Sequence, residues 1–306
     1  MTRNGPTMVF TAVLLASATL SACGGQDEPE AAGGSSDTEL PCGVQADGLL
    51  QEVIDRGEVE IYINAEYPPY ETVDANGDFE GLDIDVAHAI WDPVGVDIVF
   101  TNVTYPAVLP SLVTGKADML VNVGATEERM EVGDFTIPYS PSSTVIVVQQ
   151  GSDITSVEDL NGKTVGVEQG ALPAEQAHLV NEALKEDGGE GFEITEYPQF
   201  PVVAEELASG RLDAIITGVT VSSTLLVQKP NTYEIKDAVG ESYFALVTQK
   251  GEESFVEFLN CSIRELKESG ELVEIHQEWF GEGYAAIEPL LEELPDEIFT
   301  ARVVGG

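Results

Sequence analysis

The sequence predicts an α/β fold with a largely parallel sheet, divided into two lobes. Apolar segments with strand character alternate with amphipathic helical segments from about residue 49 to 122, and such alternation is typical of βαβ units. The same alternation starts again near residue 161. Two extended segments, near 140–148 and 242–248, join the two series. A ligand is expected in the cleft between lobes of this kind.

Periodicity and helix-ending residues place the elements of the first series. We expect a helix that ends at Gly57, a polar turn around Asn76-Gly77, and a helix that starts at residue 83, with Asp83 and Asp85 as its caps. The expected helices cover residues 49–56, 83–91 and 108–115, and the expected strands cover 59–64, 96–101 and 117–122.

The second series has the same character. Its expected strands cover residues 164–167, 193–197 and 214–217, and its expected helices cover 173–185 and 202–209. Gly210 ends the last of these helices. Two further amphipathic helices, over 253–270 and 272–279, close the folded body.

The charge of the chain excludes one class of protein. Asp and Glu number 55 and Lys and Arg number 13, which gives a formal charge of -42. A nucleic-acid binder is excluded, because recognition of phosphate requires clusters of Lys and Arg. Acidic surfaces also suit concentrated salt, where screening weakens self-repulsion. We therefore expect a halophilic or salt-tolerant source.

The N-terminus has the features of an export signal. Residues 1–22 combine Arg3 with an apolar stretch over 8–20, which is too short to span a membrane. Leu20-Ser21-Ala22-Cys23 resembles the lipobox of a bacterial lipoprotein, and this resemblance implies lipidation of Cys23. An ordinary signal peptide with an incidental cysteine is the alternative. We expect an extracytoplasmic protein that contacts the cell membrane through this lipid alone.

The segment after the signal is rich in Gly, Ser, Pro and acidic residues. Residues 23–42 are therefore expected to form a flexible acidic tether. Cys42 and Cys261 remain once Cys23 is set aside. An even number of cysteines outside the cytoplasm favours a disulfide, with two independent buried thiols as the alternative.

Residues 81–90, with the sequence GLDIDVAHAI, resemble the signature of the family 3 extracellular solute-binding proteins, the polar amino-acid receptors of ABC importers. Further segments agree with this family in order and spacing. They are Tyr67 to Tyr70, Leu109 to Asp118, Ala125 to Arg129, Gly210 to Ala214 and Leu266 to Gly270. The resemblance covers residues from about 49 to 281.

This resemblance implies a two-lobed periplasmic-binding-protein-like fold of type II, with two crossing hinge strands. Lobe 1 would comprise residues 43–140 and 246–290, lobe 2 residues 145–241, and a C-terminal extension residues 291–306. The implied function is capture of an amino acid or a related carboxylate or zwitterion by hinge closure. The implied partners are a permease and its ATPase. We expect a monomer without a catalytic residue or a cofactor. No metal is expected either, because His88, His178 and His276 lack paired ligand spacing.

The resemblance also implies site residues. Arg129 matches the arginine that forks onto the ligand carboxylate; a surface ion pair with Glu127 or Glu131 is the alternative. Tyr67, Tyr70 and Tyr105 match positions that form aromatic walls around the ligand, and packing in the core is the alternative role for Tyr70. The positions that match polar sites in the cleft are Asn122, Thr126, Gly170 and Ala171.

Two positions depart from the family pattern. Gly218 stands where an aspartate usually grips the ligand ammonium, and Gly124 stands where a hydroxyl residue is usual. Either another acid such as Glu66 takes the role, or the ligand is not an ordinary α-amino acid. The alternative function is that of a dehydratase-like enzyme on the same fold. Glu168 is its candidate acid, although we expect this residue to be solvated in a loop.

Overall fold

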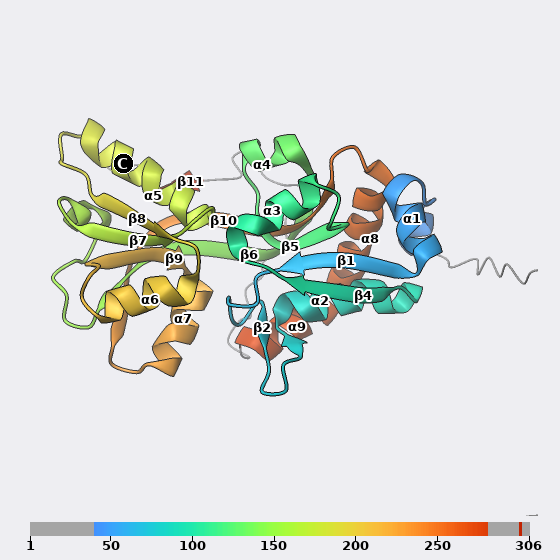
Figure 1. Ribbon diagram of the computed structural model, residues 1–306, viewed down its shortest axis with the longest axis horizontal. Coiled ribbons are helices and arrows are strands. Elements are labelled where there is room, and N and C mark those ends of the chain that lie inside the picture. Colours follow the sequence, from blue (N-terminus) through green and yellow to red (C-terminus); the bar gives the residue numbers. More distant parts are fainter. Residues whose placement is uncertain (1–39, 281–299, 302–306) are drawn as a thin grey trace, which may run out of the picture. The chain divides into compact units, whose positions relative to one another are not determined.

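The computed structural model describes residues 40–280 and 300–301 (Figure 1). The chain divides into two compact units, Met1–Asp37 and Thr38–Gly306, and every described residue belongs to the second unit. The expected signal peptide 1–22, the lipidation site Cys23 and most of the tether 23–42 therefore lie outside the described residues. The same holds for most of the expected extension 291–306.

Within the described residues, nine strands form one mixed sheet in the order β4-β1-β5-β10-β6-β9-β7-β8, and β11 pairs with β10 outside this path. The strands on one side of the sheet, which are parallel to one another, are β1 (Glu58–Ile63), β4 (Asp97–Asn102) and β5 (Met119–Gly124). The parallel strands on the other side are β7 (Thr164–Glu168), β8 (Glu193–Tyr197) and β9 (Ala214–Gly218). The predicted α/β class is confirmed.

Two long strands connect these halves of the sheet. β6 (Gly133–Gln149) and β10 (Tyr233–Gln249) have 17 residues each and pair antiparallel along most of their length. The C-terminal part of β10 also pairs with β5, whereas the C-terminal part of β6 pairs with β9. The two strands therefore change their outer partners midway, as expected for crossing hinge strands. They are longer than the predicted extended segments.

The second lobe, as we define it, contains β7, β8 and β9 with α5 (Leu172–Glu186), α6 (Phe200–Ala208) and α7 (Val219–Gln228). Alternate side chains of β6 point to the two faces of the sheet in this lobe. Ile146 and Val148 pack with residues of α5, whereas Val145 and Val147 pack with residues of α6. Because successive strand residues point to opposite faces, this near-continuous apolar run predicts a strand that is buried on both faces.

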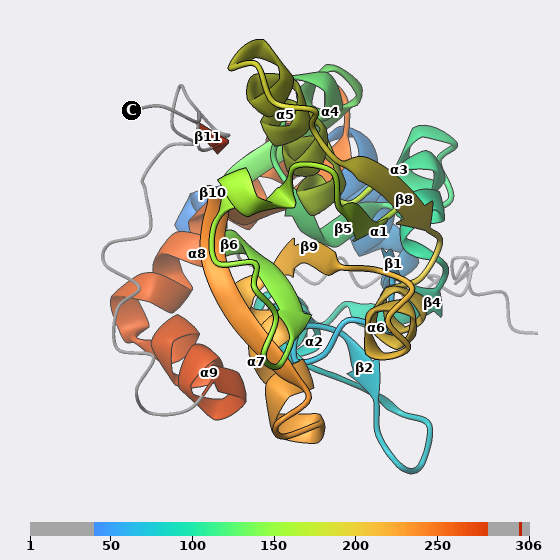
Figure 2. The same ribbon diagram turned by 90° about the vertical axis from the view of Figure 1, so that its left-hand side faces the viewer.

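The first lobe contains β1, β4 and β5 with six helices: α1 (Gly48–Arg56), α2 (Leu82–Trp91), α3 (Tyr105–Val113), α4 (Glu127–Val132), α8 (Glu253–Ser269) and α9 (Glu271–Phe280). Helices α8 and α9 are consecutive and pack against each other (Figure 2). Trp91 is fully buried, with ring centroids 5.6 Å from Phe255 and 4.9 Å from Phe258. These aromatic contacts fasten α8 to α2.

The start of α2 corrects one prediction. The helix begins after Gly81, whose φ of 139° belongs to glycine, and a Cβ there would lie 2.1 Å from the carbonyl oxygen of Tyr70. Asp83 and Asp85 are consequently inside the helix and not its caps. Asp85 accepts a 2.6 Å hydrogen bond from Nε1 of Trp279 on α9. The expected polar turn is present, because β2 (Thr72–Val73) and β3 (Phe79–Glu80) form a hairpin around it.

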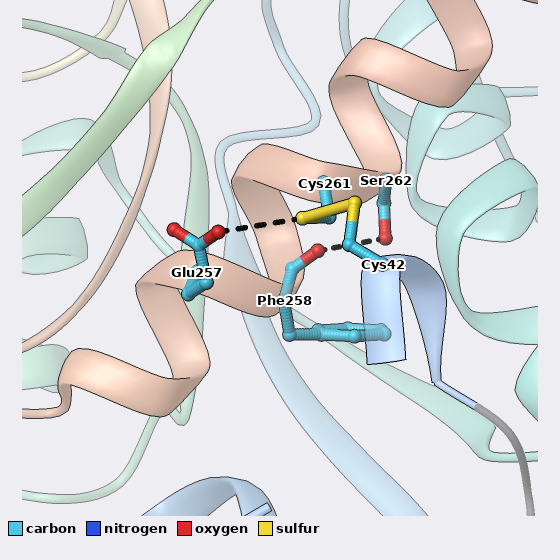
Figure 3. The surroundings of a disulfide bond; sticks show 5 residues. All are labelled: Cys42, Glu257, Phe258, Cys261 and Ser262. Carbon is cyan, nitrogen blue, oxygen red and sulfur yellow. Dashed lines mark hydrogen bonds between the residues drawn. A yellow bond between two sulfur atoms is a disulfide. The ribbon is translucent and has the colours of Figure 1, made fainter. Parts of the chain in front are cut away.

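A disulfide joins the start of the described chain to α8. Cys42 and Cys261 are bonded, with their Cα atoms 6.0 Å apart across a sequence separation of 219 (Figure 3). Cys261 is buried on α8, beside Ser262, whose hydroxyl donates to the carbonyl oxygen of Phe258. Within residues 40–280 and 300–301, no helix combines the length and the apolar character that crossing a bilayer requires.

Candidate functional site

A small cavity lies where the two lobes meet the crossing strands, and we call it the inner cavity. Its volume is about 20 Å³, which is room for roughly one water molecule. The first lobe and β10 contribute Tyr67, Tyr105, Asn122 and Phe244, the second lobe contributes Glu168, Ala171, Leu172 and Pro173, and β6 contributes Ser142 and Thr144. Four of the predicted ligand-binding positions, Tyr67, Tyr105, Asn122 and Ala171, thus share one cavity.

The aromatic rings form one connected cluster beside this cavity. Tyr67 stacks on Tyr70 with ring centroids 5.9 Å apart and meets Phe200 edge-on at 6.2 Å. Tyr70 in turn meets Phe244 edge-on at 5.1 Å and is 1% exposed. Tyr70 therefore supports the wall from behind, which is the core-packing role that the sequence left open. Phe200 comes from the second lobe, so the cluster spans both lobes.

Arg129 lies on α4, whose first residue follows the N-cap Thr126. The hydroxyl of Thr126 accepts the backbone N–H of Arg129 at 3.3 Å, so this threonine shapes the helix end that carries the arginine. The Arg129 guanidinium is buried. It donates to the carbonyl oxygens of Gly124 at 2.8 Å and Gly170 at 2.9 Å, and to Oε1 of Glu175 at 2.5 Å.

The ion-pair partner of Arg129 is therefore Glu175, and neither Glu127 nor Glu131, which the sequence offered as alternatives. Glu175 lies on α5 of the second lobe, so the pair connects the lobes. Arg129, Gly170 and Glu175 line a second cavity of about 590 Å³, which shares Tyr105 with the inner cavity. The two cavities therefore adjoin each other at Tyr105.

The two glycines that depart from the family pattern lie against side chains of the opposite lobe. A Cβ at Gly124 would be 2.7 Å from Cδ2 of Leu172, and a Cβ at Gly218 would be 2.7 Å from the hydroxyl of Tyr67. Both distances are shorter than Cβ atoms tolerate. The absent side chains therefore provide the space into which Leu172 and Tyr67 pack.

Glu168 corrects another prediction. It ends β7, is 5% exposed and lines the inner cavity, so it is not a solvated loop acid. Its Oε1 accepts the backbone N–H of Phe200 at 3.1 Å. Burial, assisted by the negative charge of Glu66, raises the pKa of Glu168 to about 8.

Glu66 lies beside this acid at the junction of the lobes. Its Oε1 accepts a 2.8 Å hydrogen bond from Nε2 of Gln199, which immediately precedes α6 in the second lobe. Its Oε2 is buried and has no hydrogen-bond partner among the described residues. Glu66 therefore contacts both lobes, although it does not itself line the inner cavity.

A buried carboxyl network supports the cavity from behind. The hydroxyl of Tyr139 donates to Oδ1 of Asp83 at 2.6 Å and accepts the backbone N–H of Asn122 at 2.9 Å. Glu71 accepts the backbone N–H of Asn64 at 2.6 Å and hydrogen-bonds Asp83. Burial raises the pKa of both carboxyls, and a hydrogen bond between them requires that one carries a proton.

This network fixes the end of β5. Asn122 has a φ of 54°, a left-handed conformation that asparagine tolerates better than most residues. The interpretation of Asp83 as a helix cap concealed this role. An apolar helix that contains a carboxylate near its first turn was the available signal, since buried acids require partners. In the part of the chain that the structure describes, no three His, Cys, Asp or Glu side chains gather closely enough to hold a metal ion.

Known proteins resemble this chain in sequence and in fold. The sequence profile of the "Bacterial extracellular solute-binding proteins, family 3" matches residues 59–282. A protein of Neisseria gonorrhoeae named "Probable histidine-binding protein" is 28% identical over 246 residues, which cover 78% of this chain and 89% of that protein.

Two solved structures extend the comparison. An ancestral arginine-binding protein bound to arginine is 33% identical, has a TM-score of 0.69, and is matched over 74% of this chain and 99% of its own. An ancestral amino acid-binding protein, described as a precursor of cyclohexadienyl dehydratase, is 26% identical with a TM-score of 0.69, over 76% and 100% of the two chains. The relatives named here are binding proteins. The matched residues span both lobes and the crossing strands, and the chain therefore belongs to the bacterial extracellular solute-binding proteins of family 3.

Proposed function

We propose that this protein captures a small amino acid or a related zwitterion between its lobes and delivers it to an ABC importer. The observation that carries the proposal is the composition of the inner cavity, whose walls come from both lobes. A ligand in that position contacts both lobes in the closed form alone. It therefore stabilises the closed form by its difference in affinity for the two forms.

The inner cavity in this arrangement holds roughly one water molecule. A ligand of amino-acid size therefore enters when the lobes move apart, and β6 and β10 are the segments that bend. Closure then excludes water from the contacts. Domain closure about a few connecting residues is a common mode of ligand capture.

Within this proposal, the site residues divide by chemistry. Arg129 binds the ligand carboxylate, because a guanidinium matches a carboxylate in a bidentate manner. Tyr67 and Tyr105 cover the apolar part of the ligand, and Tyr70 supports them. The remaining members lie along the junction of the lobes and present backbone groups, an amide, a hydroxyl or an acid: Asn122, Gly124, Thr126, Gly170, Ala171, Gly218 and Glu66.

The parts outside the described residues complete the proposal. Lipidation at Cys23 would hold the protein at the outer face of the cell membrane, and residues 23–42 would let the folded body reach the permease. A permease and its ATPase are the proposed partners, and the protein acts as a monomer.

One observation favours a second candidate, a dehydratase-like enzyme. Glu168 is a buried acid in the cavity whose pKa is raised to about 8, as a proton donor requires near neutral pH. Formation of product from a bound carboxylate would establish this candidate. Stoichiometric binding with full recovery of the ligand would exclude it.

A thermal-shift screen tests the main proposal. The mature chain is heated with each of the twenty common L-amino acids and with amine-free carboxylates, and hits are quantified by calorimetry. A ligand that binds the folded state raises the melting temperature by mass action. We expect at least one amino acid to bind with a stoichiometry near one. Failure of the whole panel in both assays would contradict the proposal.

A further inference from the structure

Glu168 places an acid in the wall of the inner cavity, at the edge of the sheet where β7 and β9 end side by side. Val165 pairs with Ala214 and Gly166 with Ile215, so the two strands run in parallel register toward the cavity. Continuing this register brings Glu168 level with the last residues of β9. Gly218 at that end has no side chain, so Glu168 is the acid that this part of the edge presents.

The negative charge at this place lacks a partner of opposite sign. Among the described residues, neither Glu168 nor Glu66 forms an ion pair with a basic side chain. The polar contact of Glu168 is with a backbone N–H, and Oε2 of Glu66 has no hydrogen bond in the described chain. Burying an unpaired carboxylate is unfavourable, so this pair of acids favours either protonation or the arrival of a cation.

The remaining walls of the cavity also suit a cation. Tyr67, Tyr105 and Phe244 line the same space as Glu168. The face of an aromatic ring carries partial negative charge and attracts ammonium and guanidinium groups. A cavity lined by an acid and three aromatic rings is therefore a better environment for a positive group than for a negative one.

Charges of both signs lie near one ring of this cavity. Tyr105 lines the inner cavity together with Glu168, and it lines the second cavity together with Arg129. A ligand that carries both charges can thus be oriented by Arg129 at one end and by Glu168 at the other. An acid and a guanidinium placed in this way favour zwitterions and cations over simple carboxylates.

We propose that Glu168 binds a positively charged group of the ligand, an ammonium or a guanidinium, and so restricts the ligands to amines. This inference rests on the proposed function, since it assigns a residue and a ligand class to the same site. The titratable groups that interact with Glu168 are Glu66 and Tyr67 from the loop after β1, Glu71 before β2, and Tyr105 from α3. Arg129 from α4 lines the adjoining cavity. Tyr197 pairs with it along β8. Within this set, Arg129 is the cation, and Glu175 already engages it.

Binding of a cation has a measurable consequence for the proton on Glu168. Without a cation beside it, the acid is largely protonated at pH 7, because burial raises its pKa to about 8. A cation at hydrogen-bond distance favours the ionised form, so about one proton is released as the ligand binds. Calorimetry in two buffers of different ionisation enthalpy measures this number on the unmodified chain.

The test compares three forms of the mature chain: wild type, Glu168→Gln, and Glu193→Gln as the control. Glu193 is exposed at the other end of the neighbouring strand β8, so its substitution removes one negative charge without touching the cavity. The probes are the twenty common L-amino acids, agmatine as an amine without a carboxylate, and glutarate as a carboxylate without an amine. Circular dichroism and melting curves establish that each variant is folded.

We expect wild type to bind an amine and to release about one proton at pH 7. Glu168→Gln should bind the same amine roughly 30-fold or more weakly and without proton release. The control should remain within about twofold of wild type, since an exposed charge contributes little.

The other outcomes contradict either the inference alone or the proposed function together with the inference. If wild type binds an amine without proton release and Glu168→Gln binds it equally well, the inference fails and the proposed function stands. Binding of glutarate in preference to every amine also overturns the inference alone. If wild type binds none of the probes, the proposed function fails and the inference fails with it.

Discussion

The guanidinium of Arg129 donates a 2.5 Å hydrogen bond to the carboxylate of Glu175, and this ion pair joins the first lobe to the second. The contact has the same chemistry as the proposed contact between Arg129 and a ligand carboxylate. Glu175 therefore engages the same guanidinium that the proposed ligand carboxylate requires. A ligand must displace this internal carboxylate or share the guanidinium with it.

Glu175→Gln should consequently raise the affinity for a carboxylate ligand by several fold, because the amide competes less well for the guanidinium. Arg129→Ala should lower the affinity by roughly 100-fold or more, since it removes the buried charge itself. Calorimetry on both variants measures these changes. Glu182→Gln is the matched control, because Glu182 is an exposed acid on the same helix. A weaker affinity in Glu175→Gln would show that Glu175 assists binding.

Gly124→Ser should destabilise the closed arrangement. Its Cβ would lie 2.7 Å from Leu172, so the leucine or the helix that carries it must shift. Overpacking of this kind costs typically 1–3 kcal/mol. Urea unfolding at equilibrium measures the loss, and the double variant with Leu172→Ala should recover part of it. Equal losses in the single and double variants would contradict a direct clash.

The stability of the unliganded protein should fall as the pH rises from about 4.5 to about 8. Glu168 has a raised pKa in the folded state, so its contribution is complete below the unfolded value of 4.5 and is lost as the pH approaches about 8. Glu168→Gln should reduce this slope, because an amide does not titrate. Chemical unfolding at pH 5, 6.5 and 8 measures both slopes. Identical slopes would show that Glu168 is not buried as described.

Replacing Cys42 and Cys261 by serine should lower the free energy of unfolding by up to about 5 kcal/mol, because the bond closes a loop of more than 200 residues in the unfolded chain. The expected loss is the same on treatment of wild type with a reductant. The reference is wild type in which neither cysteine reacts with an alkylating reagent, as confirmed by mass spectrometry. A double variant that unfolds at the same urea concentration as wild type would contradict the prediction.

High salt should raise the melting temperature. A formal charge of -42 repels itself throughout the chain, and the Debye length falls from about 10 Å at 0.1 M to about 3 Å at 1 M salt. A melting series between these concentrations measures the gain. No change across the series would count against an adaptation to salt.

The sequence predicted the strands of both lobes well, because apolar residues either alternate with polar ones or form a continuous run along them. Val59 and Ile61, for example, alternate with Glu58 and Glu60 along β1, and both are fully buried. The predicted helices missed α4 and α7. Helix α4 has only six residues and is rich in acids. Helix α7 contains Val, Thr and Ser, which have weak helix propensity.

The site was harder to predict, since its residues gain their roles from the other lobe. Glu168 follows the predicted strand 164–167 and resembles any loop acid in sequence, yet it is buried at the end of β7 and lines a cavity with Tyr67 and Tyr105 of the first lobe. Glu175 lies in the first turn of α5 and carries no sign of its partner Arg129, which is 46 residues away. Arg129 itself was identified through a short motif. A local pattern can therefore locate the cleft, although it does not reveal which charges meet across it.

The long strand β10 determines when the first lobe can be completed during synthesis of the chain, which starts at the N-terminus. β5 is flanked by β1 on one side, and its other edge is covered by residues 244–248 of β10. Residues 244–248 follow the entire second lobe in the chain. The second lobe can thus assemble its own parallel strands while the first still has an open edge, and a chain interrupted before residue 244 would expose that edge to other strands.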